Sequence, residues 1–150
     1  MPMLSYAEQA ALLDSYWGDG KGTGAPATFE LALFNGDPTL GGVEMDSVGG
    51  YAAVSITNDG TNFPAAADGQ KVCAEQTFPT PTGEWTAAGV ADTGTHWVLR
   101  DSSTGTVWDY DVLTEEVNVE IDDDTGQIVG GPVKVQPIIY YGDQSVESLA

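Results

Sequence analysis

Carboxylates are the reactive side chains that this sequence supplies in quantity. The chain has 23 Asp and Glu residues against 4 Lys and Arg. Asp109 and Asp111 stand two residues apart in an alternating segment, so on a strand they share a face at a separation of roughly 6–7 Å. That separation touches the range used by inverting glycosidases. An acidic, solvent-facing strand produces the same pattern, and we predict that the pair is not catalytic.

The other reactive residue types occur singly. His96 is the only histidine, and no serine lies in a Gly-x-Ser-x-Gly turn, so the sequence gives no support for a nucleophile–base triad. Cys73 is the only cysteine, which excludes an intramolecular disulfide. Lys71 is its one basic neighbour, and a single nearby cation is little support for a reactive thiol. One His and one Cys also fall short of a zinc site. We therefore predict no enzymatic activity and no cofactor.

The turn at residues 122–126 resembles part of a calcium-binding loop. Asp122 and Asp124 are two residues apart, and Gly126 follows them. The full EF-hand spacing fails, because Gly126 stands where a third ligand is needed and no glutamate closes the loop. Asp122 and Asp124 remain weak calcium candidates, and an ordinary acidic turn is the alternative.

The charge of the chain narrows the classes of partner. A formal charge of −19 disfavours nucleic acid and anionic membrane surfaces, since both repel an acidic protein. Two interpretations stay open: a solvated shell suited to salty surroundings, or attraction to a basic protein surface. No apolar run reaches the roughly 20 residues that cross a bilayer, and the first residues lack a basic, then apolar, signal pattern. We expect synthesis in the cytoplasm of a host.

The first element expected is a helix. Ser5 and Glu8 have the spacing of a capping box, and the residues that follow favour a helix from Tyr6 to Tyr16 or Trp17. A glycine-rich segment comes next, and it lacks the Gly-Lys-Ser/Thr ending of a phosphate-binding loop. We divide this part of the chain into a helical arm, 1–18, and a linker, 19–28.

Two-residue alternation dominates the rest of the chain. Short alternating runs separated by turn residues about every ten positions predict seven or eight strands in an antiparallel sandwich or small barrel. The prediction is a mainly β domain over 29–141, followed by a tail at 142–150. The side chains expected in its core are Leu31, Leu33, Tyr51, Phe78, Trp85, Trp108 and Tyr110.

The order of several short motifs resembles a family of tailed-phage virion proteins, variously labelled tail fibre, minor tail or head decoration proteins. The resemblance spans roughly residues 4–121 and departs from the family pattern at Ala53, where an arginine is expected. The matching segments are the helix 6–14, Ala25-Pro26-Ala27-Thr28, the strand and turn 31–38, Gly49-Gly50-Tyr51-Ala52, Thr77-Phe78-Pro79, Thr82-Gly83-Glu84-Trp85, and the hairpin with Val98-Leu99-Arg100-Asp101, Thr104-Gly105 and Trp108.

This resemblance implies a β-sandwich or jelly-roll-like module that is oligomeric and fixed to a phage particle. The function we expect first is a capsid decoration (cement) protein, a homotrimer bound to the major capsid protein on the outer capsid surface. The alternatives are a tail or fibre component that could bind a receptor, and a carbohydrate-binding module with Trp97 or Trp108 as a sugar platform. The two ends of the chain are the expected clamps, with assembly contacts at Leu4, Tyr6, Leu13, Trp17, Tyr140 and Tyr141.

Overall fold

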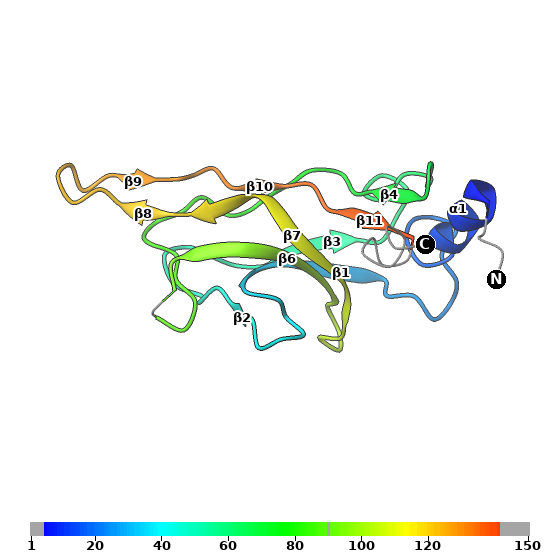
Figure 1. Cartoon of the computed structure of the whole chain (residues 1–150), viewed down its shortest axis with the longest axis horizontal. Helices are drawn as coiled ribbons and strands as arrows, with labels where there is room; N and C mark the ends of the chain where they lie inside the picture. The colour runs from blue at the N-terminus through cyan, green and yellow to red at the C-terminus, as the bar shows by residue number, and fades with distance from the viewer. Residues whose placement is uncertain (1–4, 90, 142–150) are drawn as a thin grey trace. The chain divides into compact units, whose positions relative to one another are not determined.

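The computed structural model describes residues 5–89 and 91–141; the expected contact Leu4 and the tail 142–150 lie outside them. The prediction of a mainly antiparallel β chain with one short N-terminal helix is confirmed (Figure 1). The elements are α1 (Tyr6–Asp14), β1 (Thr28–Asn35), β2 (Val43–Glu44), β3 (Val54–Thr57), β4 (Gln70–Val72), β5 (Gln76–Thr77), β6 (Thr93–Asp101), β7 (Val107–Asn118), β8 (Glu120–Ile121), β9 (Ile128–Val129), β10 (Lys134–Val135) and β11 (Ile138–Tyr140).

The helix α1 starts where its sequence predicts. The Ser5 hydroxyl accepts the Glu8 N–H at 3.3 Å, and the Glu8 carboxylate accepts the Ser5 N–H at 2.8 Å, which completes the capping box. The helix ends earlier than expected, at Asp14. Ser15 is its C-cap, and the N–H groups of Tyr16 and Trp17 turn back to the Leu13 carbonyl.

The chain forms two compact units. Unit 1 contains the described residues 5–28, 57–75 and 136–141, and unit 2 contains 29–56, 76–89 and 91–135. The helical arm and the linker that the sequence separates from the β domain are thus parts of unit 1. In the part of the chain that the structure describes, no helix is long and apolar enough to cross a membrane.

Unit 2 is built on one antiparallel sheet in the order β2–β1–β6–β7, with β3 also paired to β1. Figure 1 shows β1 and β6 side by side along much of their length. Leu31 lies opposite Leu99 and Leu33 opposite Trp97, so these four side chains share one face. All four are buried, and so are Ala32 and Val98 on the opposite face, so both faces of the sheet are covered here. The described strands do not close into a barrel, which leaves β2 and β3 at one edge and β7 at the other.

The strand β7 differs most from expectation. The alternation predicts two strands, one up to Val112 and one from Val117, but a single strand runs through both. His96 of β6 pairs with Val112, whereas Gly94 pairs with Val117. Four residues of β7 therefore oppose a single residue of β6, and this bulge interrupts the alternation without ending the strand.

An aromatic cluster packs beside the sheet in unit 2. Tyr51 stacks on Phe78 with ring centroids 6.0 Å apart, and both rings meet the edge of Trp85. The Trp85 indole N–H donates to the Gly49 carbonyl at 2.8 Å. Gly49 has φ +62, and a Cβ there would lie 2.3 Å from the Glu84 carbonyl oxygen, so only glycine allows this close approach.

Unit 1 is held by buried polar contacts as well as apolar ones. β4 pairs with β11, and Asn58, which is 1% exposed, joins three segments. Its side-chain oxygen accepts the Gly18 N–H at 2.7 Å, and its amide donates to the carbonyls of Tyr16 and Pro26. These bonds satisfy the buried amide and fix the glycine-rich segment against the rest of the unit.

Candidate functional site

Within unit 1, an ion pair joins the helix α1 to β4. Lys71 is 2% exposed and donates to the Asp14 carboxylate, whose side chain is 37% exposed. Burial raises the pKa of Asp14, but hydrogen bonds from Lys71 and the Ala66 N–H, together with the Lys71 charge, outweigh it and hold that pKa below its usual value. The sequence shows Lys71 only as a strand residue, with no sign that its charge is buried.

The residues expected to make assembly contacts fall into two groups. Leu13 and Trp17 are 5% and 7% exposed, so in this structure they pack inside unit 1. Tyr6 is 65% exposed, and Tyr140 and Tyr141 are half-buried. On the part of α1 and its C-terminal turn that the structure describes, the apolar surface is carried by Tyr6, Leu12 and Tyr16.

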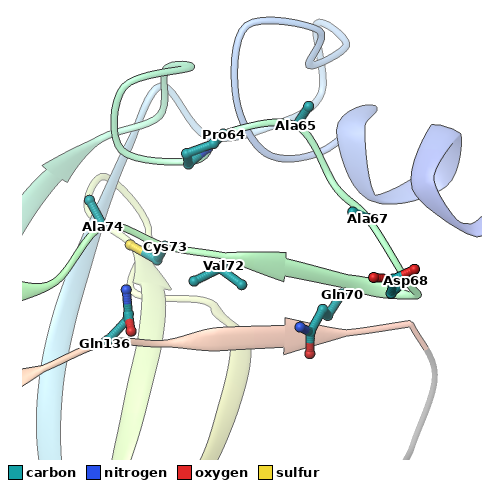
Figure 2. Close-up of a pocket in the computed structure, with 9 residues that line it drawn as sticks. All are labelled: Pro64, Ala65, Ala67, Asp68, Gln70, Val72, Cys73, Ala74 and Gln136. Atoms are coloured by element: carbon teal, nitrogen blue, oxygen red, sulfur yellow. The ribbon is translucent and has the colours of Figure 1, made fainter.

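A shallow hollow of about 240 Å³ lies beside β4 in unit 1. Figure 2 places Asp68 and Cys73 at opposite ends of this strand. Cys73 is fully buried, so its thiol is shielded from solvent. The lining residues are Pro64, Ala65, Ala67, Asp68, Gln70, Val72, Cys73, Ala74 and Gln136.

A polar network crosses unit 2 between β1, β2 and β6. Arg100 donates to both oxygens of the Glu44 carboxylate, at 2.7 and 3.1 Å. The Tyr51 hydroxyl donates to Glu44 at 3.1 Å and accepts the Leu33 N–H at 3.0 Å. Burial, more than the nearby Glu44 charge, raises the pKa of Tyr51, so its hydroxyl stays protonated and keeps both bonds. This arrangement ties β1, β2 and β6 together through side-chain hydrogen bonds.

The paired carboxylates of β7 each accept a hydrogen bond from the backbone of their own strand. The Asp109 carboxylate accepts the Tyr110 N–H at 2.9 Å, and the Asp111 carboxylate accepts the Val112 N–H at 2.7 Å. Burial raises the pKa of Asp109 to about 7; the Tyr110 N–H opposes this shift and the Asp111 charge adds to it. Neither acid lines the hollow of unit 1, and each is engaged with the backbone of its own strand.

The acidic turn at residues 122–126 connects β8 to β9. The Asp122 carboxylate accepts the N–H groups of Asp124 and Thr125, at 2.8 and 3.2 Å. These are the bonds of a turn built on an aspartate side chain. Within residues 5–89 and 91–141, no three His, Cys, Asp or Glu side chains are grouped so that they could hold a metal ion.

The tryptophans are poorly placed to serve as a sugar platform. Trp17, Trp85 and Trp97 are 7%, 0% and 5% exposed. Trp108 is half-buried and meets the edge of the Phe29 ring, with centroids 6.1 Å apart. The expectation that Trp97 could present its face to a glycan is therefore corrected, because its side chain is buried.

The expected core residues lie in unit 2. Five of them are buried, namely Leu31, Leu33, Tyr51, Phe78 and Trp85. Trp108 and Tyr110 are only half-buried, because β7 is the edge strand of its sheet. Sequence reasoning missed Asn58 and the Lys71–Asp14 pair, since each joins segments far apart in the chain.

Comparison with known families gives one result for most of the chain. A family model described as podophage GP4 fiber I protein gp80 matches residues 2–136. No curated protein matches the chain, and no solved structure matches it.

Proposed function

The chain belongs to the podophage GP4 fiber I protein gp80 family, and from that premise we propose that this phage virion structural protein is a subunit of a tail fibre. The observation that supports this proposal most directly is the family match over residues 2–136. It agrees with the resemblance to tailed-phage virion proteins, whose head-or-tail placement the motifs leave open. The fibre assignment replaces capsid decoration as the first choice because the family is described by its fibre.

The surface of the molecule supports a role in assembly. Tyr6 and Leu12 of α1 are 65% and 43% exposed, and Val129 of β9 is 55% exposed. Exposed apolar side chains on these elements are available for contacts with neighbouring subunits. The charge of −19 suits a part on the outside of the particle, away from packaged DNA.

Labelling of intact particles tests the fibre proposal. Antibody raised against the purified chain and coupled to gold is expected to decorate the tail region in electron micrographs. Quantitative mass spectrometry should then give a copy number that is a small multiple of the number of fibres. Label over the whole head, with hundreds of copies per particle, would reject the fibre proposal.

Capsid decoration remains the second candidate function. The observation that favours it is the acidic charge, because an acidic exterior protein can bind basic patches of a major capsid protein. On this alternative, particles lacking the protein should lose their DNA at lower temperature. Unchanged thermal stability of such particles would count against it.

We further propose that the chain assembles with itself as a homotrimer. The exposed Tyr6 and Leu12 offer apolar contacts near the start of the chain. Light scattering on the purified protein is expected to give three times the monomer mass of 15.7 kDa. A monomer mass at the highest soluble concentration would reject the trimer.

A further inference from the structure

The strand β7 leaves one side of the unit 2 sheet open. It is last in the order β2–β1–β6–β7, and among the residues that the structure describes it pairs with no strand other than β6 (Figure 1). We define the β7 edge as residues 107–112; it precedes the wide bulge and contains a smaller register shift between Val107 and Asp109, so its regular pairing with β6 covers residues 109–112. An open strand edge presents backbone groups that can pair with another extended segment.

The contacts of Leu33 reveal which backbone groups point out of this edge. The Leu33 N–H donates to the Tyr51 hydroxyl and its carbonyl accepts the Met45 N–H, so both groups point away from β6. Its opposite residue Trp97 must then direct its backbone groups toward Asp111, its partner on β7. Because successive residues of a strand alternate, those on either side of Asp111 direct their N–H and C=O groups outward.

Two carboxylates occupy the outward N–H groups. Asp109 accepts the N–H of Tyr110, and Asp111 accepts the N–H of Val112. Each is a local bond from a side chain to the next residue, and such bonds compete with strand pairing. An incoming strand therefore has to displace both carboxylates before it can accept hydrogen bonds from the Tyr110 and Val112 N–H groups.

The charge of the strand determines which segment can displace them. Asp109, Asp111, Glu115 and Glu116 lie on β7, which carries no lysine or arginine. A second copy of this chain would bring the same acids to the contact, and like charges that face each other across strands destabilise the pairing. A segment with lysine or arginine would instead form ion pairs with the carboxylates as they leave the N–H groups.

We propose that the β7 edge is a docking edge for an extended, lysine- or arginine-bearing segment of another protein, which adds to the sheet as an extra strand. The cations of that segment bind the carboxylates of Asp109 and Asp111, and its carbonyls replace them on the two N–H groups. Val107 and Val112, 41% and 61% exposed, offer apolar contact to its other side chains. The inference does not depend on where in the virion the chain is located.

A synthetic peptide of alternating lysine and valine is the probe for this docking. Calorimetry with the full chain is expected to show binding, and hydrogen exchange should slow at Tyr110 and Val112. The same peptide with N-methylated backbone groups should bind at least tenfold more weakly, because it cannot pair as a strand. A glutamate–valine peptide should bind at least tenfold more weakly as well.

Variants of the chain separate strand pairing from general attraction. Val112→Pro removes one outward N–H at an edge position that tolerates proline, and we expect at least a tenfold loss of peptide affinity. The double variant Glu115→Gln, Glu116→Gln removes two charges beyond the β7 edge and should lose less than threefold. If Val112→Pro fails to fold, the N-methylated peptide on the unchanged protein still decides the question.

Several results would overturn the docking proposal. Undetectable binding of the lysine–valine peptide at millimolar concentration is one. Equal binding of the N-methylated peptide would reduce the contact to charge attraction alone. A peptide-free oligomer that Val112→Pro converts to monomer would show that a second copy occupies the β7 edge. A failure of fibre labelling, by contrast, leaves each of these measurements unaffected.

Discussion

The ion pair between α1 and β4 gives an asymmetric prediction. Asp14→Asn removes the partner of Lys71 and leaves an ammonium that is 2% exposed inside unit 1. Breaking a fully buried pair in this way costs about 3–5 kcal/mol. Asp14 is 37% exposed, so water already screens the pair, and we reduce the expected loss of unfolding free energy to roughly 2 kcal/mol. For a chain of this length that loss lowers Tm by about 4–8 °C.

Replacing the other partner of the ion pair should change the free energy of unfolding very little. Lys71→Met keeps an apolar stem in the buried position, and the Asp14 carboxylate that remains is open to water. We therefore expect a change within about 1 kcal/mol. Glu75→Gln, an exposed position in the same unit, is the matched control for a net charge of one unit. It should leave Tm within about 1 °C, since exposed surface changes have small effects.

Urea unfolding at neutral pH measures these three variants against the unchanged chain. The pKa of Asp14 is lowered in the folded protein, so its stabilisation is present above the ordinary aspartate pKa and is lost as the pH falls through the folded value. The penalty of Asp14→Asn should accordingly shrink in acid. A Lys71→Met variant that is less stable than Asp14→Asn would refute the reasoning.

Three further predictions concern other parts of the molecule. Tyr51→Phe removes the hydroxyl that accepts the buried Leu33 N–H, and should cost about 1–3 kcal/mol in urea unfolding; no loss would mean that water replaces the hydroxyl. Gly18→Ala places a Cβ 2.6 Å from a backbone oxygen at φ +94 and should lower Tm by several degrees, whereas Gly24→Ala, with open space, should not lower it. Asp109 has a pKa raised to about 7 in the folded chain, so folding is favoured while this carboxyl is protonated. That stability is lost as the pH rises from the ordinary aspartate pKa to about 7. Asp109→Asn should therefore stabilise by about 1–3 kcal/mol more at pH 8 than at pH 5, and an equal effect at both pH values would contradict the burial of this carboxyl.

Local patterns predict the parts of this fold that depend on neighbours in the sequence. The Ser5–Glu8 capping box is correctly predicted, because its hydrogen bonds join residues only three positions apart. The alternation around Leu31 and Leu33 places both in the core of the sheet. The end of α1 was predicted wrongly, because Trp17 looks like a helical residue but is buried after a turn that begins at Ser15.

Features that depend on distant partners could not be read from the sequence. The bulge that joins the two halves of β7 depends on its register with β6, which alternation within β7 does not encode. The burial of Lys71 depends on Asp14, 57 positions away. The carboxylates at the β7 edge could be predicted only in part. The sequence places Asp109 and Asp111 on one face of a strand. That the N–H groups they accept point out of the sheet follows only from the sheet order.

The division of unit 1 among three chain segments has a consequence for folding during synthesis. The helix α1 and β4 are made before β11, the partner of β4, which ends at Tyr140. At about 5–20 residues per second, β4 waits on the order of 3–14 s for its partner strand. Until then the ribosome carries an unpaired β4 with α1 beside it. Pairings so distant in sequence are slow to form, so unit 1 cannot close before β11 has been synthesised.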